Sequence, residues 1–107
     1  MERTFEKRAM TILWTNQARN DYYRILDFLQ VRWGFAHVVN FIEQTEKVLN
    51  LIRANPRMFV ASQQRKKVRR GFITRQCCLF YQFENKRNEI ILLTFWDNRQ
   101  SPERVKL

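Results

Sequence analysis

Hydrophobic residues recur at steps of three and four over two long stretches in the first half of the chain. The first stretch covers residues 17–33, and its apolar positions are Ala18, Tyr22, Ile25, Leu26, Leu29 and Trp33. The second covers residues 35–54, and its stripe is Val38, Ile42, Thr45, Leu49 and Ile52. This spacing predicts two amphipathic helices, the first capped by Asn16 and the second stopped by Asn55 and Pro56. Because Gly34 alone separates them, we expect an antiparallel helical hairpin.

Short runs rich in β-branched and aromatic residues occupy much of the rest of the chain. They predict a first strand at residues 10–14 and three more at 67–74, 77–84 and 90–97. The connections at residues 75–76 and 85–88 have the length of hairpin turns, so the last three strands should pair as an antiparallel meander. The order of one strand, two helices and three strands predicts an α+β domain. We expect its helices on one face of the sheet and the other face partly open.

The length of 107 residues fits one small domain. Met10 can serve as a start, so we expect a loose leader at residues 1–9 and a single domain at residues 10–107. The chain has no apolar run long enough to span a membrane and no apolar signal core at its N-terminus. Cys77 and Cys78 are neighbours on a predicted strand, which gives one packed and one surface thiol in a reduced, cytoplasmic protein. With no third cysteine, we predict no metal and no cofactor.

Positive charge is concentrated in the second half of the chain. The formal net charge is +10, with eight Lys/Arg against six Asp/Glu up to Pro56 and twelve against four after it. Such a one-sided field costs stability through self-repulsion, so a polyanionic partner is expected, either nucleic acid or an acidic protein. The alternative is a solvated basic surface that only aids solubility.

Six cations within eleven residues form the sharpest chemical feature: Arg65, Lys66, Lys67, Arg69, Arg70 and Arg75. Because side chains alternate along a strand, Arg69 and Arg70 should point to opposite faces. This cluster is interpreted as a surface that grips phosphates or a partner beside the open sheet face. Alternatively, it protects an edge strand from aggregation.

A second group of polar residues follows the very apolar last strand: Trp96, Asp97, Arg99 and Gln100. Asp97 and Arg99 either pair to fix the strand tip, or Arg99 reaches a phosphate or a partner carboxylate. His37 is the only histidine; we expect it to be solvated on the second helix, remote from the basic strands. The sequence therefore offers no His/Glu pair for ribonuclease-style acid–base chemistry.

Several motifs occur together, in order. They are ILWT in the first strand, Ala18-x-x-Asp21, Trp33-Gly34, Asn55-Pro56-x-x-Phe59, KVRR, Leu79-Phe80-Tyr81 and FWDNRQSP at the end. From residue 10 to about residue 107 this pattern resembles the RelE/ParE superfamily of bacterial type II toxin–antitoxin modules, also called plasmid stabilisation proteins. The resemblance implies a helical hairpin on an antiparallel sheet and a cognate antitoxin.

The resemblance also implies one of two targets. RelE-like members cut mRNA in the ribosomal A site, and ParE-like members inhibit DNA gyrase without chemistry. In a metal-independent endonuclease the catalytic candidates are Arg70, Arg99 and Lys67, with Lys66. The family's arginine on the next strand falls at about Cys78, however, and its C-terminal tyrosine falls near Val105.

These departures favour ParE-like growth inhibition through gyrase. An mRNA endonuclease and a non-enzymatic basic nucleic-acid-binding protein remain as alternatives. We expect the antitoxin to be acidic and to cover the open sheet face over the cations of residues 65–75, in a hetero-oligomer or beside a toxin homodimer.

Overall fold

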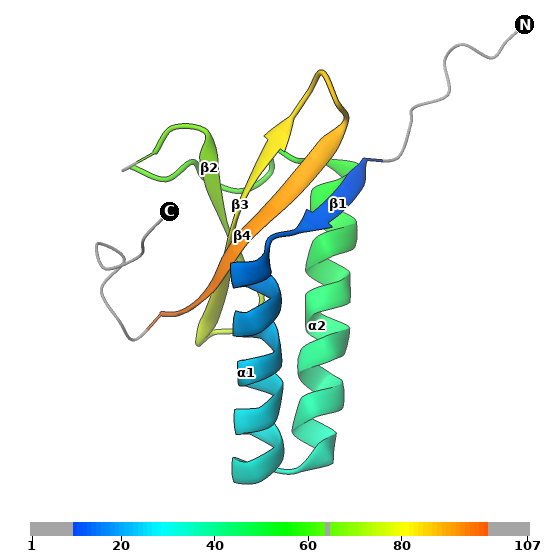
Figure 1. Ribbon diagram of the computed structural model, residues 1–107, viewed down its shortest axis with the longest axis vertical. Helices are drawn as coiled ribbons and strands as arrows, with labels where there is room; N and C mark the ends of the chain where they lie inside the picture. The colour runs from blue at the N-terminus through cyan, green and yellow to red at the C-terminus, as the bar shows by residue number, and fades with distance from the viewer. Residues whose placement is uncertain (1–9, 64, 99–107) are drawn as a thin grey trace, which may run out of the picture.

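A computed structural model describes residues 10–63 and 65–98. Its elements are β1 (Thr11–Trp14), α1 (Asn16–Arg32), α2 (Phe35–Ala54), β2 (Val68–Phe72), β3 (Cys77–Glu84) and β4 (Glu89–Asp97). The predicted α+β class is confirmed: two long helices form a hairpin against one sheet (Figure 1). The leader expected at residues 1–9 lies outside the described residues. β2 is shorter than expected and leaves Lys67 in the preceding loop.

The sheet has the strand order β1-β4-β3-β2. β2, β3 and β4 pair antiparallel, as the two short connections predicted. β1 lies on the far side of β4 and pairs with it in parallel, with Thr11 opposite Glu89 and Trp14 opposite Leu92. The most apolar strand is therefore an inner one, with a strand bonded along each of its edges.

Thr15, rather than Asn16, caps α1. Its hydroxyl oxygen accepts a hydrogen bond from the backbone N–H of Ala18 at 3.0 Å. The same hydroxyl donates to the carbonyl of Leu92 at 2.8 Å, which ties the start of the helix to β4. Threonine is a good cap in its own right, and its bond to β4 explains why the cap lies one residue earlier than predicted.

The bend of the hairpin depends on Gly34. Its φ of 99° lies in the region that disfavours every residue with a side chain. The backbone N–H of Gly34 donates to the carbonyls of Leu29 and Gln30, which closes the end of α1. The chain can therefore reverse within one residue, as the hairpin prediction requires.

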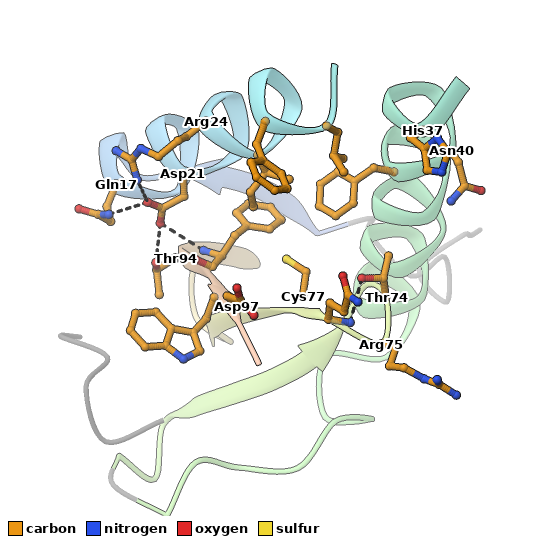
Figure 2. Close-up of a pocket in the computed structure, with 17 residues that line it drawn as sticks. Gln17, Asp21, Arg24, His37, Asn40, Thr74, Arg75, Cys77, Thr94 and Asp97 are labelled. Atoms are coloured by element: carbon orange, nitrogen blue, oxygen red, sulfur yellow. Dashed lines mark hydrogen bonds and ion pairs between the residues drawn. The ribbon is translucent and has the colours of Figure 1, made fainter. Parts of the chain in front are cut away.

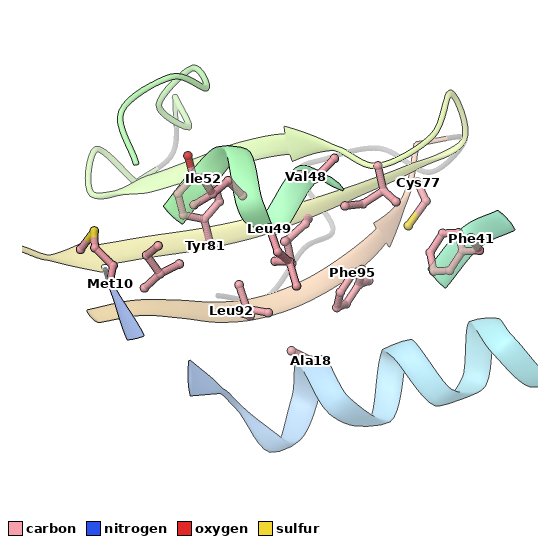
Figure 3. Close-up of a cluster of buried hydrophobic side chains, with 13 residues drawn as sticks. Met10, Ala18, Phe41, Val48, Leu49, Ile52, Cys77, Tyr81, Leu92 and Phe95 are labelled. Atoms are coloured by element: carbon pink, nitrogen blue, oxygen red, sulfur yellow. The ribbon is translucent and has the colours of Figure 1, made fainter. Parts of the chain in front are cut away.

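The main core lies between the helices and the sheet (Figure 3). Ala18, Ile52, Tyr81 and Leu92 are fully buried there. Fully burying aliphatic and aromatic side chains contributes about 1.5–3 kcal/mol each, so this layer dominates the stability of the fold. The hydroxyl of Tyr81 donates to the carbonyl of Pro56 at 2.7 Å, and burial raises its pKa to about 12.

The second face of the sheet is less open than predicted, because it carries its own apolar cluster. Val68, Cys78 and Phe80 are buried there, with Leu93 and Trp96 packed against them. Cys77 is buried on the helix-covered face, so the expectation of one surface thiol is wrong. Both thiols are free, and burial raises the pKa of each, that of Cys77 to about 12.

Candidate functional site

Arg70 marks the second face of the sheet at the end where β4 stops. Its guanidinium Nη2 donates to Oδ1 of Asn98 at 3.2 Å. The guanidinium carbon lies 4.9 Å from the ring centre of Phe72. The charge of Arg70 and a hydrogen bond from it also act on the thiol of Cys78, although burial dominates and raises the pKa of that thiol. Arg70 is thus a half-buried cation held in one orientation. A guanidinium that is already held in place loses little side-chain entropy when it contacts an anion.

Asn98 is the residue that joins the parts of this end of the sheet. Besides accepting from Arg70, its side-chain amide donates to the carbonyl of Arg75 at 3.2 Å. Its backbone N–H donates to the carbonyl of Gln76 at 2.9 Å. One side chain therefore links β2, the turn between β2 and β3, and the end of β4. Its place in the polar tip after a buried strand was the available signal, but it was not among the predicted site residues.

Arg69 points to the opposite face from Arg70, as the strand alternation predicted. Its guanidinium donates to the carbonyls of Phe59 at 2.6 Å and Arg57 at 3.3 Å. It also lies 5.9 Å from the ring centre of Phe83. These contacts fix the loop that precedes β2, so the structure gives Arg69 a role in the fold and separates it from Arg70.

The other predicted cations are dispersed. Arg65, Lys66 and Lys67 are exposed in the loop before β2, and Arg75 is exposed in the turn after it. Arg99 and Gln100 lie outside the described residues. Of the predicted cations that the structure describes, Arg70 is the one held against the end of β4.

A groove of about 540 Å³ lies at the same end of the sheet, on the helix-covered side (Figure 2). The apolar side chains that line it are Ile25, Phe28, Leu29, Phe41, Cys77 and Phe95. Its polar lining includes Arg24, His37, Asn40, Arg75 and Gln76. Trp96 and Asp97 also line the groove. Together with Arg75, three of the predicted site residues therefore lie here. We name this feature the hairpin groove.

His37 belongs to this groove. Its side chain is exposed, as predicted, and its ring centre lies 5.7 Å from that of Trp33. Of the predicted cations, Arg75 in the turn after β2 lines the same groove as His37, whereas residues 65–70 do not line it. Sequence spacing could not reveal this, since the turn between β2 and β3 approaches α2 only in the folded chain.

Asp21 is the buried carboxylate of the groove, and four groups donate to it. Its Oδ2 accepts from the hydroxyl of Thr94 at 2.5 Å and the backbone N–H of Phe95 at 3.3 Å. Its Oδ1 accepts from Gln17 at 2.8 Å and from Arg24 at 3.3 Å. Figure 2 shows these bonds converging between α1 and β4. A buried charge with this many donors holds two elements together, which accounts for the Asp of the Ala-x-x-Asp motif.

No group of three or more His, Cys, Asp or Glu residues suited to a metal ion occurs within residues 10–63 and 65–98. The same part of the chain contains no helix long and apolar enough to cross a bilayer.

Comparison with known proteins places these features in a family. Residues 12–102 match the model of the ParE toxin of the type II toxin–antitoxin system, parDE. No curated protein matches the chain.

Several solved structures share the fold. The chromosomal ParDE toxin–antitoxin system of P. aeruginosa superposes with a TM-score of 0.68 at 16% identity, over 83% of this chain and 96% of that one. The isolated E. coli RelE toxin gives 0.61 at 13% identity, over 89% and 90%. The RelBE2 complex of Mycobacterium tuberculosis gives 0.58 at 15% identity, over 85% and 100%.

At these identities the structures share the fold alone, whereas the family model spans most of the sequence. The chain therefore belongs to the ParE toxin family of type II toxin–antitoxin systems.

Proposed function

We propose that this chain is the toxin of a type II toxin–antitoxin module, that a cognate acidic antitoxin neutralises it, and that it inhibits growth through DNA gyrase. Family membership and the ParDE structure among the neighbours support the module. In this proposal the toxin acts by surface contact and needs no cofactor.

The residues around Arg70 support gyrase rather than mRNA as the target. Phe72, Cys78 and Asn98 lie around its guanidinium, and none of them accepts a proton near neutral pH, since burial raises the pKa of the Cys78 thiol. RNA cleavage needs a group that takes the 2′-hydroxyl proton as well as a cation that stabilises the phosphate. Phe72, Cys78 and Asn98 thus supply no base, and Asp97, the carboxylate that acts on the Cys78 thiol, is itself engaged in an interaction, which supports contact without chemistry.

The mRNA endonuclease is the second candidate, because Arg70 is an oriented cation on a fold shared with RelE. In that mechanism Arg70 stabilises charge on the phosphate, and Lys66 or Lys67 takes the proton. Arg99, which lies outside the described residues, would add a second cation.

Induced expression separates the two candidates when plasmid supercoiling and message integrity are read together. We expect relaxed or linearised plasmid with intact mRNA, and inhibition of purified gyrase by the purified protein. Arg70→Ala is compared with Arg87→Ala, an exposed arginine in the turn between β3 and β4. Normal supercoiling with codon-phased cuts that Arg70→Ala abolishes would replace this proposal with the endonuclease. Harmless expression with salt-dependent duplex binding would replace both with simple nucleic-acid binding.

A further inference from the structure

We propose that a cavity at the end of α2 binds a nucleoside phosphate whose phosphate group is terminal. The cavity has a volume of about 470 Å³, and we name it the arginine cavity after Arg53 and Arg57, which line it. Figure 1 shows the end of α2, the start of β1 and the turn between β3 and β4 at the same end of the molecule. The hairpin groove lies at the other end of the sheet, where β4 stops. This site goes beyond the proposed function and does not depend on the target of the toxin.

The first argument is that Arg57 is held in position by its neighbours. Its carbonyl accepts from the guanidinium of Arg69 at 3.3 Å, and its backbone N–H donates to Oδ1 of Asn55 at 3.2 Å. Its own guanidinium carbon lies 5.1 Å from the ring centre of Phe83. A guanidinium that rests on an aromatic ring keeps the N–H groups at its edge for a bidentate contact with an anion.

Arg53 provides a second oriented cation in the same cavity. It is half-buried in the last turn of α2, and its Nη1 donates to Oδ1 of Asn50 at 2.8 Å. Two guanidinium groups therefore line one small space. A phosphate monoester carries a charge of about −1.5 to −2 near neutral pH. It complements two guanidinium groups better than a carboxylate does, because a carboxylate carries a single charge.

The charge around the cavity is the second argument, because none of the described residues that line it is acidic. Glu84 and Glu89 are close in the chain and pair with each other across β3 and β4. Their neighbours Phe83 and Ile90 pack in the core on the helix-covered side, so both glutamates point to the other face. The C-terminus of α2 contributes only about half of a negative elementary charge. The two arginines therefore leave the cavity positive.

The third argument concerns the rest of the lining, which favours a nucleoside as the group that carries the phosphate. Three of its side chains are amides, those of Asn55, Asn85 and Asn88. An amide presents a donor and an acceptor side by side, which matches the edge of a nucleobase. The volume also falls within the range of about 300–1,000 Å³ that is usual for small-molecule sites. The same chemical group occurs in a free nucleotide and at the 5′-phosphorylated end of a nucleic-acid strand.

Calorimetric titration of the purified chain with AMP tests the site, with adenosine and inorganic phosphate as the two partial ligands. We expect AMP to bind more tightly than either of them. Arg53→Gln and Arg57→Gln should each weaken AMP binding at least about tenfold, because each removes a charged donor. Arg87→Gln removes the same charge from an exposed position in the nearby turn that does not line the cavity, and it should bind within about twofold of the wild type. No binding of AMP, or an equal loss in Arg87→Gln, overturns the site, and equal affinity for AMP and inorganic phosphate overturns its nucleoside part.

Thermal melts of each variant show whether a loss of binding reflects a loss of folding. If Arg57→Gln melts early, Asn85→Asp decides, because it keeps the size of an exposed side chain and places a negative charge in the lining. It should weaken AMP binding, whereas Asn20→Asp, exposed on α1, should not, and equal binding by both variants overturns the site.

Competition experiments separate the two sources of the ligand. An oligonucleotide with a 5′-phosphate that displaces AMP, when its 5′-hydroxyl counterpart does not, assigns the site to a strand end. If neither strand displaces AMP, the ligand is the free nucleotide. Equal displacement by both strands overturns the requirement for a terminal phosphate. None of these measurements reads growth inhibition, so the site and the proposed function can fail separately.

Discussion

At the scale of single residues, the side chains of Asp21 and Asn98 hold the site in place. Asp21 ties α1 to β4 through two of the four bonds donated to it, those from Thr94 and Phe95. Asn98 ties Arg70 to the turn between β2 and β3. Neither attracts attention in the sequence by its residue type, because Asp and Asn are common in helix turns and loops. Their importance comes from the partners that the fold brings to them.

Replacing Asp21 by Ala should lower the free energy of unfolding by about 3 kcal/mol, because two buried donors, the Thr94 hydroxyl and the Phe95 N–H, lose their acceptor at once. Asp27, which is exposed on the same helix, provides the matched control. Asp27→Ala should change stability by less than about 0.5 kcal/mol. Urea denaturation followed by circular dichroism measures both variants, and equal losses would show that the bonds of Asp21 contribute little.

The two buried thiols predict how stability falls at high pH. Burial raises the pKa of Cys77 from 9.0 to about 12, so the folded state holds this proton more tightly than the unfolded state. The contribution of Cys77 to stability is therefore complete below about pH 9 and is lost as the pH rises toward about 12. We expect the free energy of unfolding to decline over this window and Cys77→Ala to flatten the decline. A variant with the same slope as the wild type would contradict the assignment to Cys77.

At the scale of elements, the sequence predicted the helices and the last three strands well, because each is specified by local periodicity and turn length. Gly34, with its φ of 99°, ends α1 close to where the pattern indicated. Non-local pairing was less accessible. β1 was expected as a strand, but the sequence of residues 10–14 does not indicate that it pairs with β4. The cap of α1 is Thr15 rather than the predicted Asn16, and Thr15 is bonded to β4.

Thr15 should therefore matter more to α1 than Asn16 does. Thr15→Val keeps the shape of the side chain and removes both the capping oxygen and the bond to Leu92. We expect it to cost about 1–2 kcal/mol of stability, against a few tenths for Asn16→Ala. Thermal unfolding of the two variants measures the difference, and a larger loss in Asn16→Ala would restore the original assignment of the cap.

At the scale of the whole molecule, the sequence indicated that the chain is basic but not where its charges act. Arg69 and Arg70 look alike in the sequence, yet Arg69 fixes a loop, whereas Arg70 is half-buried at the end of the sheet and held by Asn98. The hairpin groove was not predicted at all. Its walls come from α1, α2, the turn after β2 and the end of β4, and only the assembled fold brings these segments together.

The net charge of +10 predicts a stability that rises with salt. Screening weakens repulsion among the exposed cations, and the Debye length falls from about 30 Å at 0.01 M to about 8 Å at 0.15 M ionic strength. We expect the melting temperature to increase by several degrees over this range. The increase should be smaller in a Lys66→Gln, Lys67→Gln variant, which removes two exposed charges. A melting temperature that falls with salt would mean that attractive ion pairs outweigh the repulsion.

The parallel pairing of β1 with β4 has a consequence for biosynthesis. β1 is synthesised before the other strands but cannot join the sheet until β4 is present, because β4 lies between β1 and β3. While a nascent polypeptide is still attached at its C-terminus, the central strand emerges from the ribosome last, and the hairpin has no finished sheet to rest on. A chain built this way completes its sheet, and with it the contact between Arg70 and Asn98, only after β4 has been made.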